Sequence, residues 1–474
     1  SATLGGSTAM SCAKSSTEAV ESRLHSRPRL QLKSAPIPRH PHCTALTPAS
    51  PPSLRIAQLR QRLHDLGAKP CHEDRLLRSW SQVCSYDKKG SPAETFFPAA
   101  LRNELPAIEA ELNGLARLHG EYPVNGHGSL DRSPTLTLPR TAGEGTNVAL
   151  RASSNSDEVA RLLVKLHDGQ MVESVLLPRG GLCISTQVGC AVGCVFCMSG
   201  RDGLIRQLGS AEIVAQVVLA RKRRAVSKVV FMGMGEPAHN LDNVLEAIDV
   251  LGTHGNIGHK NLVLSTVGDV RVFERLMERC VAPSELPHPN PDGTTSHSTK
   301  HDKAVQVAGY PPAGEGVKAP SPYPLPEGEG TVKPALALSL HSTNVELRAK
   351  LLPHAPNISV EELVERAELY ARATGYPTQY QWTLIESLND SDAEVERIAA
   401  LLKGKYALMN FIPFNAVEGL PYRRPSAQRG SLPLRRLREH HDLLYHSHPR
   451  LPVGEFHIRD HRLPDHGHDL ERVR

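Results

Sequence analysis

Between residues 183 and 412, short runs of β-forming residues alternate with stretches whose apolar residues recur at helical spacing. The β-rich runs lie at 228–232, 261–266, 335–340, 379–384 and 407–412. The helical stretches between them lie at 211–222, 241–251, 360–373 and 393–402. Such alternation is typical of a parallel sheet or barrel, in which chemistry takes place at the C-terminal ends of the strands. We therefore predict an α/β fold.

The sequence before this unit divides by composition. Residues 1–53 are rich in Ser, Pro, Ala and Arg without periodicity, which predicts a disordered leader. Apolar residues at helical spacing predict a small helical domain over 54–118, whose last helix covers 98–118. A Gly-, Ser- and Pro-rich linker at 119–158 and a β-hairpin at 159–182 are expected to follow.

One stretch interrupts the alternation. Residues 283–333 contain many Pro, Gly, His and Ser residues, and a loop of this length is improbable inside a compact barrel. The phrase at 321–331 also echoes the phrase at 133–146, so we interpret both as inserted, disordered sequence. The α/β unit then spans 183–424, and a divergent tail occupies 425–474.

The composition of the chain excludes few classes of function. The formal net charge of +5 and the pI near 8.7 permit nucleic-acid binding without requiring it. We find no apolar run of about 18 residues and no signal-peptide pattern, so we expect a soluble, cytoplasmic protein without membrane contact. The nine cysteines are odd in number, and four lie within 183–197. This clustering favours a metal site in a reducing compartment over disulfides.

Three of these cysteines, Cys190, Cys194 and Cys197, are spaced so that one tight loop carries them all. Thiolates are the soft ligands that hold iron–sulfur clusters, and three ligands on a four-iron cluster leave one iron open to a small molecule. Glycines directly before Cys190 and Cys194 allow the backbone to turn closely around a cluster. Two other interpretations stay open here: a zinc site with Cys183 as the fourth ligand, or buried cysteines without a special role.

The cysteine phrase extends upstream as Cys183-Ile-Ser-Thr-Gln-Val-Gly-Cys190-Ala-Val-Gly-Cys194-Val-Phe-Cys197. Further phrases follow in order: Phe231-Met232-Gly233-Met234-Gly235-Glu236-Pro237, Leu264-Ser265-Thr266, Leu338-Ser339-Leu340-His341, Asn389-Asp390 and Ile412-Pro413-Phe414-Asn415. With these phrases the chain resembles the radical S-adenosylmethionine enzymes that methylate carbon 2 of adenine in ribosomal and transfer RNA, and their Cfr-type antibiotic-resistance relatives. The resemblance covers roughly residues 54–424 outside the two insertions, and includes Leu66-Gly67-Ala68-Lys69-Pro70 in the helical domain.

This resemblance implies a partial (β/α)6 radical S-adenosylmethionine barrel, with the small N-terminal helical domain and the short β-hairpin attached. It implies a [4Fe–4S] cluster on Cys190, Cys194 and Cys197, whose open iron binds the amino and carboxylate groups of S-adenosylmethionine. The other residues that it assigns to the S-adenosylmethionine pocket stand at or just beyond predicted strand ends: Gly235, Glu236, Ser265, Ser339, Leu340, His341 and Asn415.

The resemblance also implies a reaction that uses two molecules of S-adenosylmethionine. One methylates a cysteine near the C-terminus, and the other is cleaved reductively to a radical that activates this methyl group for addition to adenine. Cys183 would resolve the resulting protein–RNA adduct, and Glu173 would remove the proton from carbon 2. The expected partners are 23S rRNA, tRNA as a second candidate, and an electron donor such as flavodoxin or ferredoxin. The chain is expected to be a monomer.

One part of the family pattern is missing from this sequence. The methyl-carrying cysteine should stand near the C-terminus in a phrase that ends Cys-Gly-Gln, but no cysteine follows Cys280. We interpret the Arg- and His-rich tail as an out-of-frame translation of the corresponding family segment. Two alternatives are therefore kept: a radical S-adenosylmethionine enzyme with a different substrate, and a catalytically impaired RNA-binding relative.

Contacts with RNA are predicted less directly. The run Arg221-Lys222-Arg223-Arg224 ends a predicted helix, and such a run could contact phosphates. A basic last turn is also favoured by the helix dipole alone. By the resemblance, the helical domain is the better candidate for an RNA platform.

Overall fold

The computed structural model describes residues 54–124, 158–280, 331–415, 417 and 419–426, and the backbone of two short strands at 443–446 and 455–458. The predicted leader, and most of the predicted linker, insertion and tail, lie outside these residues. Two predicted boundaries are wrong. Residues 119–123 belong to a strand rather than to the linker, and Val332 is fully buried against α6, so the packed core resumes before residue 333.

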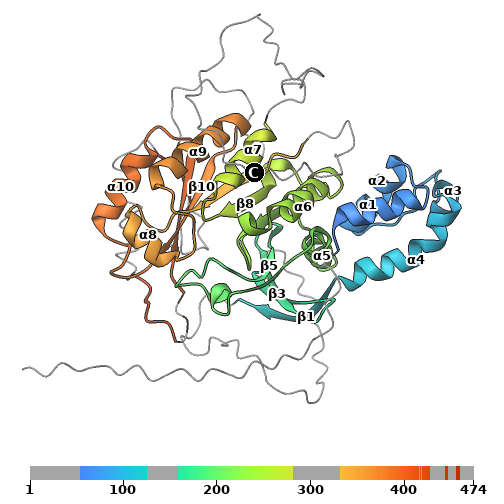
Figure 1. Ribbon diagram of the computed structural model, residues 1–474, viewed down its shortest axis with the longest axis horizontal. Helices are drawn as coiled ribbons and strands as arrows, with labels where there is room; N and C mark the ends of the chain where they lie inside the picture. Colours follow the sequence, from blue (N-terminus) through green and yellow to red (C-terminus); the bar gives the residue numbers. More distant parts are fainter. Residues whose placement is uncertain are drawn as a thin grey trace, which may run out of the picture. The chain divides into compact units, whose positions relative to one another are not determined.

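The elements are coloured along the chain in Figure 1. The helices are α1 (Ile56–Asp65), α2 (Pro70–Gln82), α3 (Ala93–Phe96), α4 (Ala99–Gly114), α5 (Ser210–Arg221), α6 (Leu241–Thr253), α7 (Val270–Glu278), α8 (Val345–Leu351), α9 (Val360–Thr374) and α10 (Asp392–Leu402). The main sheet has, in bonded order, β1 (Ala116–Pro123), β2 (Ala160–Leu166), β3 (Met171–Leu177), β4 (Gly181–Cys183), β7 (Lys228–Phe231), β8 (Leu262–Thr266), β9 (Ala335–Ser339), β10 (Thr378–Leu384), β11 (Ala407–Pro413), β13 (Glu455–Ile458) and β12 (Leu443–His446). A separate two-stranded ribbon is formed by β5 (Gln187–Gly189) and β6 (Leu204–Gln207).

Within the described residues, six neighbouring strands run parallel in the order β4, β7, β8, β9, β10, β11. At least one helix lies between each of these strands and the next along the chain. Both edges of this parallel unit carry antiparallel neighbours, β3 beside β4 and β13 beside β11. The predicted partial (β/α)6 barrel is therefore confirmed, and its edge strands β4 and β11 pair with antiparallel strands rather than with each other.

The N-terminal region is helical, as predicted, but its last helix is shorter than predicted. Helix α4 ends at Gly114 rather than at 118, and β1 begins at Ala116. Strand β1 pairs antiparallel with β2, which pairs with β3, so the predicted hairpin is part of a three-stranded extension of the sheet. Pairing with β2 satisfies backbone groups of residues 116–123 in place of helical hydrogen bonds. No helix in the described ranges is long and apolar enough to cross a membrane.

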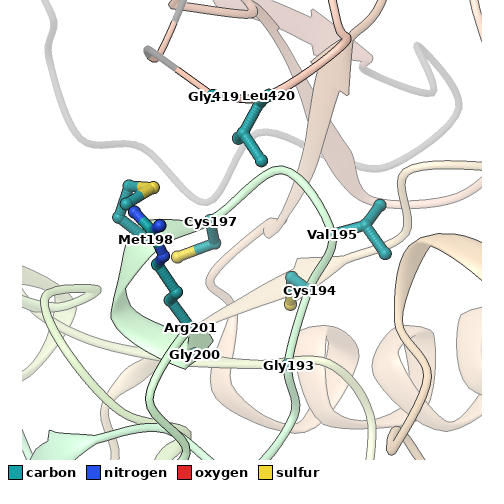
Figure 2. Close-up of a pocket in the computed structure, with 9 residues that line it drawn as sticks. All are labelled: Gly193, Cys194, Val195, Cys197, Met198, Gly200, Arg201, Gly419 and Leu420. Carbon is teal, nitrogen blue, oxygen red and sulfur yellow. The ribbon is translucent and has the colours of Figure 1, made fainter. Parts of the chain in front are cut away.

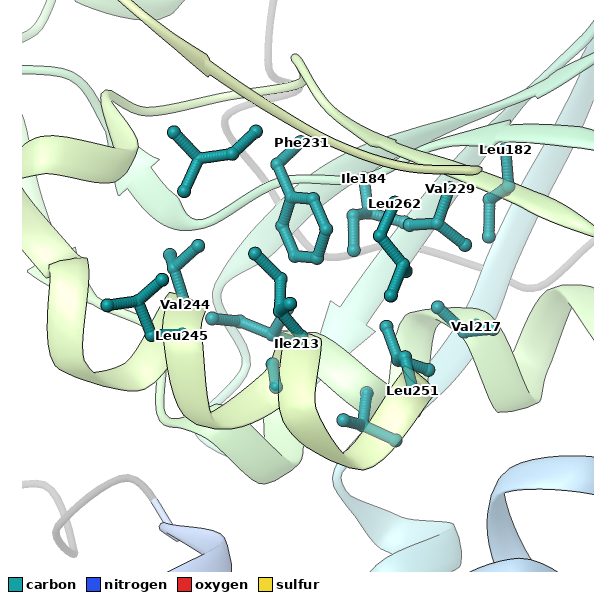
Figure 3. Packing of buried hydrophobic residues seen from close by; sticks show 14 of the residues in the cluster. Leu182, Ile184, Ile213, Val217, Val229, Phe231, Val244, Leu245, Leu251 and Leu262 are labelled. Carbon is teal, nitrogen blue, oxygen red and sulfur yellow. The ribbon is translucent and has the colours of Figure 1, made fainter. Parts of the chain in front are cut away.

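The main apolar core lies between the sheet and its helices. Helices α5 and α6 lie side by side (Figure 1), and their apolar side chains meet those of β4, β7 and β8 (Figure 3). The side chains that meet there are Leu182, Val229, Phe231, Leu262, Ile213, Val217, Val244, Leu245 and Leu251. Complete burial of one such side chain stabilises the folded state by about 1.5–3 kcal/mol. The parallel strands are thereby held in register above these helices.

The opposite face of the sheet carries smaller side chains. Because successive residues of a strand point to opposite faces, Cys183 faces away from Leu182. Cys183 packs with Val230, Val263 and Ala337 in a second apolar cluster that contains no helical residue among those described. The alternation of β4 thus places a thiol on the inner face of the partial barrel.

A buried ionic cluster fastens the β2–β3 turn to the start of α5. Arg206 donates from Nε to Asp168 Oδ2 (2.6 Å), and from Nη1 and Nη2 to the two carboxylate oxygens of Glu212 (2.9 Å each). The Glu212 side chain is fully buried and also accepts a hydrogen bond from the Gly209 N–H (2.9 Å). His167 Nδ1 lies 3.1 Å from Glu212 Oε1. Arg206 therefore holds two carboxylates together at the turn of the hairpin.

We predict that Arg206→Ala lowers the free energy of unfolding of the metal-free chain by about 3–5 kcal/mol, because it leaves two largely buried carboxylates without their cation. Urea denaturation followed by circular dichroism measures this change. The matched control is Arg275→Ala, which removes an exposed ion pair with Asp242 and is expected to cost less than about 1 kcal/mol. Equal losses in the two variants would contradict the role given to Arg206.

The same cluster predicts a pH dependence. Burial alone would raise the pKa of Asp168, but hydrogen bonds from Arg206 and Gln170 outweigh it and hold this pKa below its ordinary value. The resulting stabilisation is fully present above about pH 3.9 and is lost as the pH falls through the folded-state pKa. In Arg206→Ala, the part of the free energy of unfolding that is lost on protonation of Asp168 should be smaller than in the native chain.

Candidate active site

Cys190, Cys194 and Cys197 lie on one loop that leaves β5 and ends at a short 3-10 turn (Met198–Gly200). Gly189 starts the loop with a φ of +78°, and a Cβ there would lie 2.0 Å from the carbonyl oxygen of Gly203. The Cys190 N–H donates to that same oxygen (3.0 Å). The close approach of β5 and β6 therefore requires glycine at position 189.

The loop borders a cavity of about 310 Å³. Figure 2 shows Cys194 and Cys197 on the loop, with Leu420 reaching toward it from the C-terminal segment. The cavity is lined by Gly193, Cys194, Val195, Cys197, Met198, Gly200, Arg201, Gly419 and Leu420. Cys197 is exposed, whereas Cys190 and Cys194 are partly buried. The site is thus open on one side and enclosed on the other.

The donor set fits an iron–sulfur cluster. Burial raises the pKa of Cys190 and of Cys194, and the charge of Cys197 adds to this effect, so these two thiols need a metal's positive charge to ionise. In the described ranges, no three His, Cys, Asp or Glu side chains converge on the position of a single metal ion. Cluster cysteines bind different irons and need no such convergence, whereas a structural zinc ion needs four ligands around one point. The zinc alternative therefore gains no support from the structure.

Gly235 and Glu236 follow β7, as predicted. Gly235 has a φ of +103°, and a Cβ there would lie 2.6 Å from Gln187 Cβ. The Gln187 side chain accepts the Glu236 N–H (2.7 Å). The Glu236 carboxylate accepts the N–H groups of Ala238 (3.1 Å) and Val267 (3.0 Å). Burial raises the pKa of Glu236 to about 7, although these hydrogen bonds and one from Thr266 oppose the rise.

His341 follows β9 and contacts the cysteine loop. Its ring packs edge-to-face against Phe196, with centroids 4.8 Å apart. Burial, assisted by the charge of Arg348, lowers the pKa of His341 to about 3, so the ring is neutral. Nδ1 accepts the Thr383 N–H (3.0 Å), which assigns the proton to Nε2. The backbone of His341 has a φ of +61°, a strained value for a residue with a side chain.

The remaining predicted pocket residues differ in how they are placed. Ser265 and Ser339 lie at the ends of the strands β8 and β9, which pair with each other. Leu340 is fully buried in the main core, and its N–H donates to the Gln381 carbonyl (3.1 Å). Asn415 lies just beyond β11, and its Oδ1 accepts a hydrogen bond from Arg424 (3.0 Å). All four stand at the C-terminal edge of the parallel strands.

Cys183 and Glu173 share the inner face of the sheet. Val175 on β3 is paired with Cys183 on β4, and Glu173 is two residues from Val175 and so points to the same face. Burial raises the pKa of Cys183 to about 12, and the charge of Glu173 contributes to this rise. The Glu173 carboxylate lies 3.7 Å from Arg161 Nη1 and is partly exposed. The two predicted catalytic side chains are therefore within electrostatic reach of each other.

The sequence analysis missed helix α8 and the residues that it brings to the site. The Leu351 carbonyl accepts the Val195 N–H (3.1 Å), and the His354 N–H donates to the Val192 carbonyl (3.2 Å). Helix α8 therefore holds the cysteine loop directly. A signal was present in the sequence: Asn344 caps this helix by accepting the Leu347 N–H (2.8 Å), and such caps mark helix starts.

The side chains of the basic run 221–224 bind other groups of the same chain. Arg221 donates to the Ser81 carbonyl (2.7 Å) and Lys222 to Asn113 Oδ1 (2.8 Å). Arg223 pairs with Glu121, and Arg224 donates to the Glu158 carbonyl (2.8 Å). These contacts fasten the end of α5 to α2, to α4 and to the β1–β3 extension. They support the structural interpretation of the run rather than contact with phosphates.

Comparisons with known proteins agree with this site. The Radical SAM superfamily matches residues 184–284. A probable RNA methyltransferase of Leptothrix cholodnii is 54% identical over 373 residues, which cover 79% of this chain and 84% of the relative. A probable RNA methyltransferase of Azoarcus sp. is 54% identical over 375 residues, which cover 79% of this chain and 84% of the relative. A third, from Pseudomonas aeruginosa, is 53% identical over 378 residues, which cover 79% of this chain and 86% of the relative.

A solved structure supports the same grouping. The crystal structure of a radical SAM methyltransferase from Sphaerobacter thermophilus is similar to this chain with a TM-score of 0.55 and 28% sequence identity. The similarity covers 82% of this chain and 92% of that one. The cysteine loop, the parallel sheet and these relatives lead to one conclusion: the chain belongs to a family of radical SAM RNA methyltransferases.

Proposed function

We propose that this protein is a methyltransferase that acts on carbon 2 of an adenine in RNA, with 23S rRNA as the substrate and tRNA as a second candidate substrate. The observation that carries the proposal is the shared inner face of Glu173 and Cys183, at the edge of the sheet from which the cysteine loop begins. A carboxylate and a thiol on one face are what the removal of the adenine proton and the resolution of a protein–RNA bond require. Cytoplasmic location, a monomeric state and electron supply by a flavodoxin or ferredoxin belong to the same proposal.

In this proposal Cys190, Cys194 and Cys197 hold a [4Fe–4S] cluster. When bound, the cluster supplies the electron for reductive cleavage of S-adenosylmethionine. Glu236 would bind the amino group of this molecule, because its buried carboxylate lies beside the loop and affects the pKa of Cys190. Gly235, Ser265, Ser339, Leu340, His341 and Asn415 would line the rest of the pocket at the strand ends.

The neutral His341 has a defined part in that pocket. Its Nδ1 is occupied by the Thr383 N–H, so only the Nε2 proton is available to a ligand. Its contact with Phe196 couples the ring position to the cysteine loop. His341 is therefore suited to donate one hydrogen bond at any pH near neutrality.

Cys280 is not suited to replace the methyl-carrying cysteine. It follows α7, which starts beyond the C-terminal end of β8 and runs back toward the start of β9. The neighbouring Arg279 donates to the Val332 carbonyl (3.0 Å), close to the start of that strand. Cys280 therefore lies at the N-terminal edge of the sheet, opposite the cysteine loop. Of the two alternatives kept above, a radical S-adenosylmethionine enzyme with a different substrate is the one that this placement favours.

The proposed function predicts specific reaction products. After anaerobic reconstitution with iron and sulfide, the chain is incubated with S-adenosylmethionine, dithionite and unmodified ribosomal RNA, and products are identified by mass spectrometry. Formation of 2-methyladenosine together with 5′-deoxyadenosine is the result that the proposed function requires. Formation of 5′-deoxyadenosine alone would support the alternative, and formation of neither by a cluster-loaded chain would contradict both.

A further prediction concerns the metal ligands. Cys194→Ala and Cys197→Ala should abolish the iron–sulfur absorbance and most of the bound iron, because each removes one of three thiolates. Cys183→Ala is the matched control, and it should retain full iron content because the thiol lies on the inner face outside the loop. Loss of metal in all three variants, with zinc rather than iron in the native chain, would instead establish a four-cysteine zinc site.

A further inference from the structure

Arg348 is a buried cation that the surrounding chain compensates only in part. It lies on α8, and 5% of its surface is exposed. Its Nη2 donates to the carbonyl oxygens of Val267 and Ser339, the latter at 3.4 Å. No described residue accepts a hydrogen bond from its Nε, and no described carboxylate is ion-paired with it. Since an uncompensated buried charge is costly, an anion beside this side chain would stabilise it.

The anionic groups near Arg348 belong to the candidate site. Burial lowers the pKa of Arg348 to about 10, while the charges of Cys194 and Glu236 favour its ionised form, so it is cationic at neutral pH. Glu236 and Arg348 bind the backbone of the same residue: Glu236 accepts the Val267 N–H (3.0 Å), and Arg348 donates to the Val267 carbonyl. The cation is thus fixed at the end of β8, beside the residue expected to bind S-adenosylmethionine.

The same helix also fixes the cysteine loop. One turn after Arg348, the Leu351 carbonyl accepts the Val195 N–H (3.1 Å), from the residue that follows Cys194. Leu351 and Leu352 pack in an apolar cluster with Val192, against which Cys190 and Cys194 also lie. Any displacement of α8 would therefore move the guanidinium and the thiols together, and their separation is set by the fold.

We infer that Arg348 is a positioning residue that supplies the fixed positive charge facing the thiolate-bound cluster. The inference rests on the proposed function, because it needs a cluster on Cys190, Cys194 and Cys197. Arginine suits this place because it keeps its charge when buried and holds it in a rigid planar group. Since reduction makes the cluster more negative, a cation held beside it stabilises the reduced form.

The test is a redox titration of the reconstituted full chain followed by electron paramagnetic resonance, with iron and sulfide content measured on the same samples. In Arg348→Gln, iron content should be retained, and the one-electron reduction should be disfavoured about tenfold, which is a fall of ~59 mV in midpoint potential. Arg348→Lys, which keeps the charge, should show a much smaller fall. Arg275→Gln, which removes an exposed arginine of α7, should show none.

Each other outcome has a defined meaning. An unchanged potential in a fully loaded Arg348→Gln variant would overturn the inference and leave the proposed function intact. If Arg348→Gln fails to hold iron, Arg348→Lys and Arg348→Met decide: recovery of the cluster by lysine alone supports a charge role, and recovery by both overturns it. Failure of the native chain to hold a cluster would instead contradict the proposed function itself.

Discussion

The site depends on holding three thiols within one short loop. Thiolates at this spacing repel one another, and burial further disfavours their ionised form, as the raised pKa values of Cys190 and Cys194 show. The loop is nevertheless kept in one shape by glycine at position 189, by a hydrogen bond to the neighbouring ribbon, and by two backbone hydrogen bonds to the α8 segment. The protein thus orders the loop with neutral backbone contacts and leaves the thiols available to a metal centre.

The architecture could be predicted largely from the sequence, because each core strand is a short apolar run and each helix carries an apolar stripe. Strands β7 to β11 and helices α5, α6, α9 and α10 all lie within a few residues of the predicted ranges. Ser359 and Ser391 cap α9 and α10, which explains why those starts were clear. Helix α8 was missed because it has only seven residues, too few for a periodic pattern to stand out. The boundary at 114–116 was missed because sequence periodicity does not report strand pairing with a distant segment.

The positions of the predicted site residues at the strand ends could be predicted from the sequence, but the contacts that support them could not. Order along the chain was enough to place Gly235, Ser265 and Ser339 at successive strand ends, because parallel strands end at one edge. Arg348 could not be found in this way, since its importance comes from burial beside groups that are distant in sequence. The run 221–224 was noticed in the sequence, but the structure gives it a structural role. Its charge suggested an external partner, yet its side chains bind carbonyl, amide and carboxylate groups of the protein.

The central claim is that the cysteine loop holds a four-iron cluster with one iron left open for S-adenosylmethionine. Mössbauer spectroscopy of the chain reconstituted with iron-57 tests it directly, with spectra recorded before and after S-adenosylmethionine is added. The account predicts the signal of a four-iron cluster in which a single iron changes its isomer shift when the molecule binds. A cluster of another type, or four irons that all stay unchanged, would contradict it.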